Sequence, residues 1–207
     1  MSSKITRDVV ESFLHCKLKG HLVLTGQQGI KSDYEIMIAE KRADGRLDAI
    51  DKILTDHPGE EIPRNIPLTT SILKQGASFI LDPTLEDDFV CLDFDALKKV
   101  DGPSKLGTFH YAPVLFSQGS TVGTVQRSLL ELYGLLLSRL QGQMPVNGFI
   151  WHGNTCKAVK VRLNADLRNT ERLLRDLKDI CSSAAVPPLI LKREAGHPRF
   201  GHRTEQK

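Results

Sequence analysis

The chain has 207 residues, of which 40% are hydrophobic and 26% are charged. This balance is typical of a globular protein and excludes a disordered or fibrous chain. With 28 Lys and Arg against 25 Asp and Glu, the net charge is +3, which permits a nucleic-acid partner without requiring one. No apolar run reaches the roughly 18 residues that span a bilayer, and the first residues lack the apolar segment of a signal peptide. We therefore expect a cytoplasmic protein with no membrane partner.

Apolar periodicity predicts mainly helices in the first quarter of the chain and strands after it. The expected elements, in chain order, are helices at about 6–24 and 33–55, a proline-rich loop at 58–67, and strands at 78–81 and 89–92 on either side of an acidic turn. Thr6 is the expected N-cap of the first helix because a threonine hydroxyl can accept from the first free backbone N–H groups. The two strands are typical of a hairpin or meander.

The second half of the chain predicts a further alternation of strands and helices. The expected elements are a turn at 101–104, a strand at 108–116, a Leu-rich helix at 122–140, a hairpin formed by strands at 146–152 and 156–163, and a helix at 166–181. This order is typical of an α/β fold, with a mixed central sheet flanked by helices on both faces. We expect one domain over residues 1–191, followed by a disordered basic tail at 192–207.

The four cysteines lie far apart, and none forms a Cys-x-x-Cys pair: Cys16, Cys91, Cys156 and Cys181. A structural zinc site needs closely spaced ligands, so this spacing does not predict a zinc module. Disulfides are rare in reducing compartments, so the thiols other than that of Cys16 are interpreted as buried or incidental.

Two carboxylates, Asp93 and Asp95, stand two positions apart in a β-rich run. In a strand, this spacing places both side chains on one face, where they could bind a hard cation such as Mg²⁺. The alternative is a solvent-facing strand end at which Asp95 caps a turn into the following residues.

Other polar residues have both a functional and a structural interpretation. Glu35 lies in the first turn of the second helix, where an acid also complements the helix dipole. Gln126 and Tyr133 are seven residues apart and so share one face of the predicted 122–140 helix, with Arg127 beside them. They are candidates for substrate contacts, or else the polar edge of a mostly buried helix.

Five stretches of this chain occur in the order in which a known family has its motifs. They are FLHCKLKGHL at 13–22, SDYE at 32–35, DALKKV at 95–100, HYAPV at 110–114 and QRSLLELYG at 126–134. The first resembles the F-x-x-C-P-x-K-x-x-L opening of RecB-like nucleases in the PD-(D/E)XK superfamily, with Lys17 where proline is usual. The others resemble, in turn, the start of the acidic helix, the strand with the first metal-binding aspartate, the next strand and the helix with the Gln-containing motif. The run from about 5 to 191 resembles the nuclease domain of a bacterial group in this family.

The resemblance implies a restriction-endonuclease-like fold and a metal-dependent DNA nuclease activity. In such nucleases, Mg²⁺ or Mn²⁺ polarises the scissile phosphate and lowers the pKa of the attacking water. By position, Asp95 would be the metal ligand, Glu35 a second acid at the metal and Gln126 a contact to substrate or water. Arg127 and Tyr133 would contact the nucleic acid. The implied partners are DNA and a helicase or additional nuclease domain.

The chain departs from the family pattern on the strand after Asp95. The (D/E)xK acid and lysine are expected near 112–118, where the sequence reads APVLFSQ and contains neither. No lysine occurs between Lys105 and Lys157. Loss of a group that stabilises developing charge costs a rate factor of about 10² or more, so we expect an impaired or inactive nuclease.

A second departure concerns the iron–sulfur cluster that many relatives hold with one early and three late cysteines. Cys16 matches the early ligand, and PPLILK at 187–192 matches the segment that precedes the late ones, but no cysteine follows. One thiolate cannot hold a cluster that needs about four, so no cluster is expected and the chain resembles a truncated relative.

Three hypotheses follow from these motifs and departures. The chain is a metal-dependent DNA nuclease, complete or impaired; a non-catalytic nucleic-acid-binding module on the same fold; or a module that assembles with a partner. The ordered motifs favour descent from a nuclease, as in the first hypothesis, whereas the missing acid and lysine favour the other two.

Overall fold

The computed structural model describes residues 4–27, 29, 33–117, 121–152, 157–163, 167–182 and 186–188. The tail expected at 192–207 lies outside the described residues, as does Cys156. Within the described part of the chain, no helix is both long enough and apolar enough to cross a membrane.

Six helices occur in the described residues, two more than expected, because the first expected helix is divided in two and a short helix, α4, is additional. They are α1 (Arg7–His15), α2 (Lys17–Leu24), α3 (Asp33–Asp56), α4 (Thr70–Lys74), α5 (Thr124–Gln141) and α6 (Leu167–Ser182). The long helices expected near 33–55, 122–140 and 166–181 are confirmed as α3, α5 and α6. They were predictable because each carries the apolar repeat of a helix packed on one side.

The strands form a five-stranded mixed sheet and a separate two-stranded ribbon. They are β1 (Phe79–Leu81), β2 (Thr84–Glu86), β3 (Cys91–Asp93), β4 (Ala96–Ser104), β5 (Gly107–Ser117), β6 (Asn147–His152) and β7 (Lys157–Arg162). The sheet order is β1-β4-β5-β6-β7, and β2 pairs with β3 in the ribbon. Among the strands that the structure describes, only β5 and β6 pair in parallel, with α5 as the connection between them, and the other neighbouring pairs are antiparallel. The protein therefore has the expected α/β fold with a mixed central sheet.

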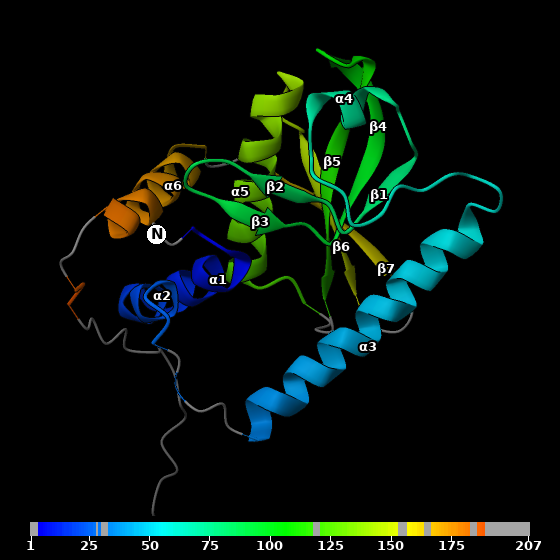
Figure 1. Ribbon diagram of the computed structural model, residues 1–207. Coiled ribbons are helices and arrows are strands. Elements are labelled where there is room, and N and C mark those ends of the chain that lie inside the picture. Colours follow the sequence, from blue (N-terminus) through cyan, green and yellow to red (C-terminus); the bar gives the residue numbers. More distant parts are fainter. Residues whose placement is uncertain are drawn as a thin grey trace, which may run out of the picture.

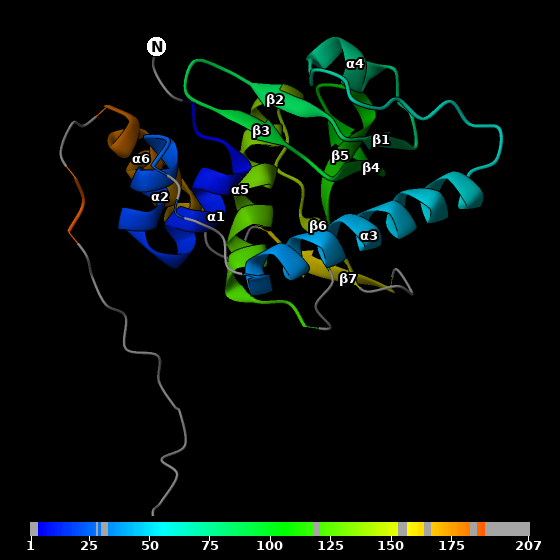
Figure 2. The ribbon, with the colours of Figure 1, turned by 60° about the horizontal axis from the view of Figure 1, so that its bottom comes forward.

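Helices cover both faces of this sheet (Figures 1 and 2). On one face, α5 packs against β5 and β6, α1 and α6 pack against α5, and α2 packs against α1. On the other face, α3 brings Ile50 and Ile53 onto Leu81, Ala96 and Val114. The larger core lies on the α5 side, where side chains such as Leu97, Leu115 and Ile150 are fully buried.

The helix expected at 6–24 is in fact two helices that meet at Cys16. Thr6 caps the first as predicted, because its hydroxyl accepts from the backbone N–H of Val9. Cys16 has extended backbone angles, φ −155° and ψ 125°, and serves as the N-cap of α2. The two helices pack closely where Gly20 meets Phe13, since a Cβ at Gly20 would lie 2.7 Å from the Phe13 Cβ. The apolar pattern continues across the break and therefore did not reveal it.

Two predictions about turns are wrong. The stretch 101–104 is the end of β4, which pairs with β5 through an irregularity between Asp101 and Ser104, and the hairpin turn comes immediately after it. The acidic stretch at 81–88 contains β2, which pairs with β3. Gly and Pro at 102–103 indicated a turn, but a long two-stranded hairpin tolerates them at its irregular end. The 146–152 and 156–163 hairpin is confirmed by the antiparallel pairing of β6 and β7.

Candidate functional site

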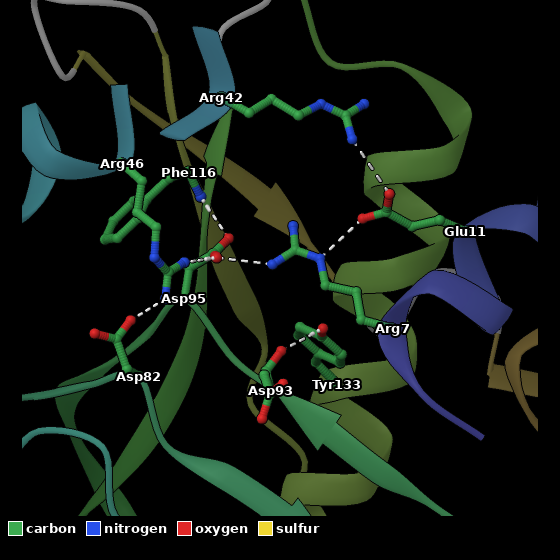
Figure 3. Close-up of polar contacts among 9 residues, drawn as sticks. All are labelled: Arg7, Glu11, Arg42, Arg46, Asp82, Asp93, Asp95, Phe116 and Tyr133. Atoms are coloured by element: carbon green, nitrogen blue, oxygen red, sulfur yellow. Dashed lines mark hydrogen bonds and ion pairs between the residues drawn. The ribbon is translucent and has the colours of Figure 1, made fainter. Parts of the chain in front are cut away.

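Asp95, the expected metal ligand, lies between β3 and β4, directly before the first residue of β4, and is only 2% exposed. Its Oδ1 accepts hydrogen bonds from the Nη1 atoms of Arg7, over 2.7 Å, and of Arg46. Its Oδ2 accepts from the backbone N–H of Phe116 over 2.9 Å. Figure 3 shows both guanidinium groups converging on this carboxylate, Arg7 from α1 and Arg46 from α3. Asp95 therefore joins two helices to β5.

The two arginines also bind further acids around Asp95. The second guanidinium nitrogen of Arg46 donates to Asp82, whose other oxygen accepts from Nε of Arg64 over 2.8 Å. We refer to the whole network as the Asp95 cluster: Arg7, Glu11, Arg42, Arg46, Arg64, Asp82 and Asp95.

Glu11 completes the cluster on the side of α1. Nε of Arg7 donates to Oε1 of Glu11 over 2.8 Å, and Nη1 of Arg42 approaches Oε2 at 3.5 Å. Through Arg42 and Arg46, α3 contacts the carboxylates of Glu11 and Asp95 (Figure 3).

Electrostatics explains why Arg7 stays charged. Burial alone would lower the pKa of the Arg7 guanidinium, but the negative charges of Asp95 and Glu11 raise that pKa well above its ordinary value. A buried charge without a partner is costly, so the Asp95 carboxylate depends on the guanidinium groups of Arg7 and Arg46. The cluster is therefore a structural ion-pair network that links α1, α3 and the sheet.

The arrangement around Asp95 does not fit a divalent cation. Both oxygens of its carboxylate already accept from N–H donors, and the two nearest charged groups are cationic. A magnesium ion needs oxygen ligands with free lone pairs in near-octahedral geometry. In the part of the chain that the structure describes, no group of three or more His, Cys, Asp or Glu side chains could hold a metal. Glu35 lies in α3, but its side chain lies outside the described residues.

Asp93 and Asp95 do not form the carboxylate pair that their spacing suggested. β3 ends at Asp93, so the two residues do not lie in one strand. Asp93 is exposed and accepts from the Thr84 hydroxyl over 2.7 Å, whereas Asp95 is buried among arginines. The alternative interpretation of Asp95 as a solvent-facing cap is also wrong, because Asp95 is buried and β4 begins directly after it.

Gln126 and Arg127 lie in the first turn of α5. Gln126 is half-buried and its amide folds over Gly123, the N-cap of the same helix, while Arg127 is exposed. Among the described contacts, none joins Gln126 to Asp95. The structure thus shows no contact between Asp95 and Gln126, and because it does not describe the Glu35 side chain, the expected grouping of the three residues stays a prediction.

Tyr133 is fully buried, which leaves no ring surface for a nucleic acid and corrects the contact expected of it. Its hydroxyl donates to the carbonyl oxygen of Asp93 over 2.7 Å, and its ring packs against Phe94 with centroids 4.2 Å apart. Burial raises the pKa of this hydroxyl far above its ordinary value. Tyr133 thus positions the end of β3, which leads to Asp95.

Cys16, the residue matched to an iron–sulfur ligand, is a half-buried free thiol between α1 and α2. The segment at 189–192 that would precede further cysteines lies outside the described residues. Cys91 and Cys181 are also free, and burial raises the pKa of both thiols.

The arginines of the cluster were not identified from the sequence, although one signal was present. Arg46 stands four positions before Ile50 and seven before Ile53, so it shares the buried side of α3 with them. A charged residue in such an apolar stripe indicates a buried ion pair. Arg7 and Arg64 carry no comparable signal.

Comparison with known proteins adds no family. No protein-family model matches the chain, and no curated protein matches it.

Proposed function

We propose that this protein is a non-catalytic nucleic-acid-binding module on a RecB-like, restriction-endonuclease-like fold. The ordered motifs at 13–22, 32–35, 95–100, 110–114 and 126–134 support the ancestry. The expected strands follow one another as β4 and β5, and the Gln-containing motif begins α5. The mixed five-stranded sheet is compatible with that fold.

The observation that carries the non-catalytic interpretation is the environment of Asp95. Two guanidinium groups and one backbone N–H occupy the carboxylate that a nuclease would use for its metal. The adjacent strand β5 contains no Asp, Glu or Lys. The positive charges beside Asp95 are therefore the guanidinium groups of Arg7 and Arg46, where a nuclease would have its metal ion.

Arginines at the rim of the cluster support binding of a phosphate backbone. The side chains of Arg42 and Arg64 are 65% and 45% exposed, and each has one ion-pair contact in the described network. A guanidinium carries five N–H donors, so each retains donors for phosphate oxygens.

Binding and cleavage assays test this proposal on the full chain. Labelled single-stranded and duplex DNA are incubated with Mn²⁺ and the wild type or Asp95→Asn. We expect no cleavage, and binding whose affinity falls steeply with salt because phosphate contacts release counterions. Arg42→Gln should weaken binding more than Arg175→Gln, a matched exposed arginine in α6.

Two results would overturn the proposal. Cleavage that needs Mn²⁺ and disappears in folded Asp95→Asn would establish a nuclease. Absence of both cleavage and binding would favour the partner-assembly hypothesis.

One observation favours that assembly hypothesis as a second candidate. Ile36, Leu47 and Leu54 are exposed large apolar side chains of α3. They are 11 and 7 residues apart and therefore lie along one side of the helix.

A further inference from the structure

The face of the sheet that α3 covers is only partly buried. In register, Leu81, Ala96, Val114, Phe149 and Lys160 form one row across all five strands. Cross-strand partners lie on the same face, so this row can be followed from the buried to the open side. Leu81, Ala96 and Val114 are buried beneath α3, whereas Phe149 is half-buried and Lys160 is exposed. The open part of the face thus lies over β6 and β7.

Aromatic rings gather at this open part. Trp151 is the register partner of Phe116, and their ring centroids lie 6.1 Å apart. Trp151 also meets Phe79 edge-on at 6.0 Å. Phe116, Phe149 and Trp151 are half-buried, so their rings are held in place by neighbours and keep exposed surface. Rings fixed in this way lose little conformational entropy when another flat group stacks on them.

Two lysines lie among these rings. Nζ of Lys98 is 5.3 Å from the Phe149 centroid and 5.8 Å from the Phe79 centroid. Lys160 is the cross-strand neighbour of Phe149. Among the described residues, neither lysine forms an ion pair with an acid, and β5, β6 and β7 contain no Asp or Glu. The face is therefore cationic as well as aromatic.

We infer that this aromatic–lysine face, formed by Lys98, Phe116, Phe149, Trp151 and Lys160, binds a single-stranded polynucleotide. The inference rests on the proposed nucleic-acid-binding function and gives it a location that adjoins the Asp95 cluster at Phe116, whose N–H donates to Asp95 and whose ring centroid lies 5.9 Å from the Arg46 guanidinium. Unpaired bases stack on exposed rings, and lysines next to the rings neutralise the adjoining phosphates. A duplex cannot bind in this way because its base faces are already stacked.

Trp151 is the single tryptophan of the chain, so its fluorescence reports on this face alone. The experiment titrates the full chain with an oligothymidylate of about 20 nucleotides, longer than the roughly 4–16 that one small domain covers. Anisotropy of the labelled oligonucleotide measures binding anywhere on the protein, and quenching of Trp151 measures binding at this face. We expect both signals to give the same dissociation constant. An oligouridylate arm distinguishes RNA from DNA, and stacking on either supports the inference.

Substitutions test the contributing side chains. Phe149→Leu keeps an apolar side chain and should weaken binding about tenfold, the effect of one lost base–ring stack. Lys160→Gln should weaken binding and reduce its salt dependence, whereas Lys74→Gln, an exposed lysine of α4, should leave both unchanged.

The outcomes separate this inference from the proposed function. Binding that changes the anisotropy but does not quench Trp151 would overturn the proposed site and leave the proposed function intact. The same conclusion would follow if folded Phe149→Leu and Lys160→Gln bound with unchanged affinity. Equal affinity for a duplex with equal quenching would also overturn it. Absence of any binding would overturn both.

Discussion

Arg7 and Asp95 are 88 positions apart in the chain, and the guanidinium of Arg7 donates to the Asp95 carboxylate over 2.7 Å. Arg7 begins α1, and Asp95 directly precedes β4. The pair therefore attaches the first helix to the central sheet at a position where the family pattern predicts a metal ligand. Its consequences for stability are separate from any activity and can be measured directly.

The first prediction concerns the charge of Asp95. Asp95→Asn keeps the size of the side chain but leaves Arg7 and Arg46 without their shared carboxylate. Breaking a buried ion pair costs about 3–5 kcal/mol, and we expect a loss near 3 kcal/mol in denaturant unfolding because Arg7 and Arg46 are partly exposed. Asp93→Asn, at an exposed acid, should cost less than about 1 kcal/mol. A gain in stability for Asp95→Asn would instead indicate a carboxylate held ready for a cation.

The second prediction concerns the fork geometry of Arg46, which contacts both Asp82 and Asp95. A lysine presents one ammonium group and cannot reproduce two separate guanidinium contacts. Arg46→Lys should therefore destabilise the protein by about 1.5–3 kcal/mol, the net worth of a hydrogen bond to a charged group. Limited proteolysis should then cut α3 faster than in the wild type. If neither the stability nor the rate of proteolysis changed, a single contact from residue 46 to Asp82 or Asp95 would be sufficient to hold α3 in place.

The third prediction concerns Gln141, which completes the edge of β5 before β6 begins. Its Oε1 accepts from the backbone N–H of Tyr111 over 2.8 Å, and its Nε2 donates to the Tyr111 carbonyl over 3.0 Å. Gln141→Met leaves both buried backbone groups without a partner and should cost about 1–3 kcal/mol for each unsatisfied group. Gln143→Met, at an exposed glutamine, is the control and should change stability by less than about 0.5 kcal/mol. Equal effects of the two substitutions would contradict this role.

The fourth prediction concerns alkaline pH. Burial raises the pKa of Tyr111 from its ordinary value of 10.0 to about 12. Below pH 10 the hydroxyl is protonated in both states, so Tyr111 adds no pH dependence. Between about pH 10 and 12 the unfolded chain loses this proton and the native protein keeps it, so stability falls as pH rises. The fall in the free energy of unfolding should be smaller in Tyr111→Phe, and an equal fall would show that other groups cause it.

Much of the fold follows from local patterns. The apolar repeats of α3, α5 and α6 and the β6–β7 hairpin were predicted because their periods reflect which side of an element is buried. The break at Cys16 was missed because α1 and α2 bury a continuous set of apolar residues on either side of it. The end of β4 was missed because Gly102 and Pro103 are typical of turns, whereas the pairs on either side of them, Asp101 with Phe109 and Ser104 with Gly107, continue the strand.

The candidate site was predicted less well than the fold. Asp95 was identified as important from its place in a motif, but its partners come from α1, α3 and β5. Tyr133 was placed on the correct helix, but its burial depends on contacts with Phe94 and Asp93 across the core. Spacing within one element does not reveal such contacts between elements.

By itself, the sequence determined an α/β protein, the identity of most helices and strands, and the absence of an acid and a lysine from residues 112–118 after Asp95. Only the tertiary structure decided that arginines surround Asp95 and that aromatic rings and lysines meet over β6 and β7. The physical reason is that periodicity records how each segment is buried, whereas the partner of a charge depends on how segments far apart in the chain pack together.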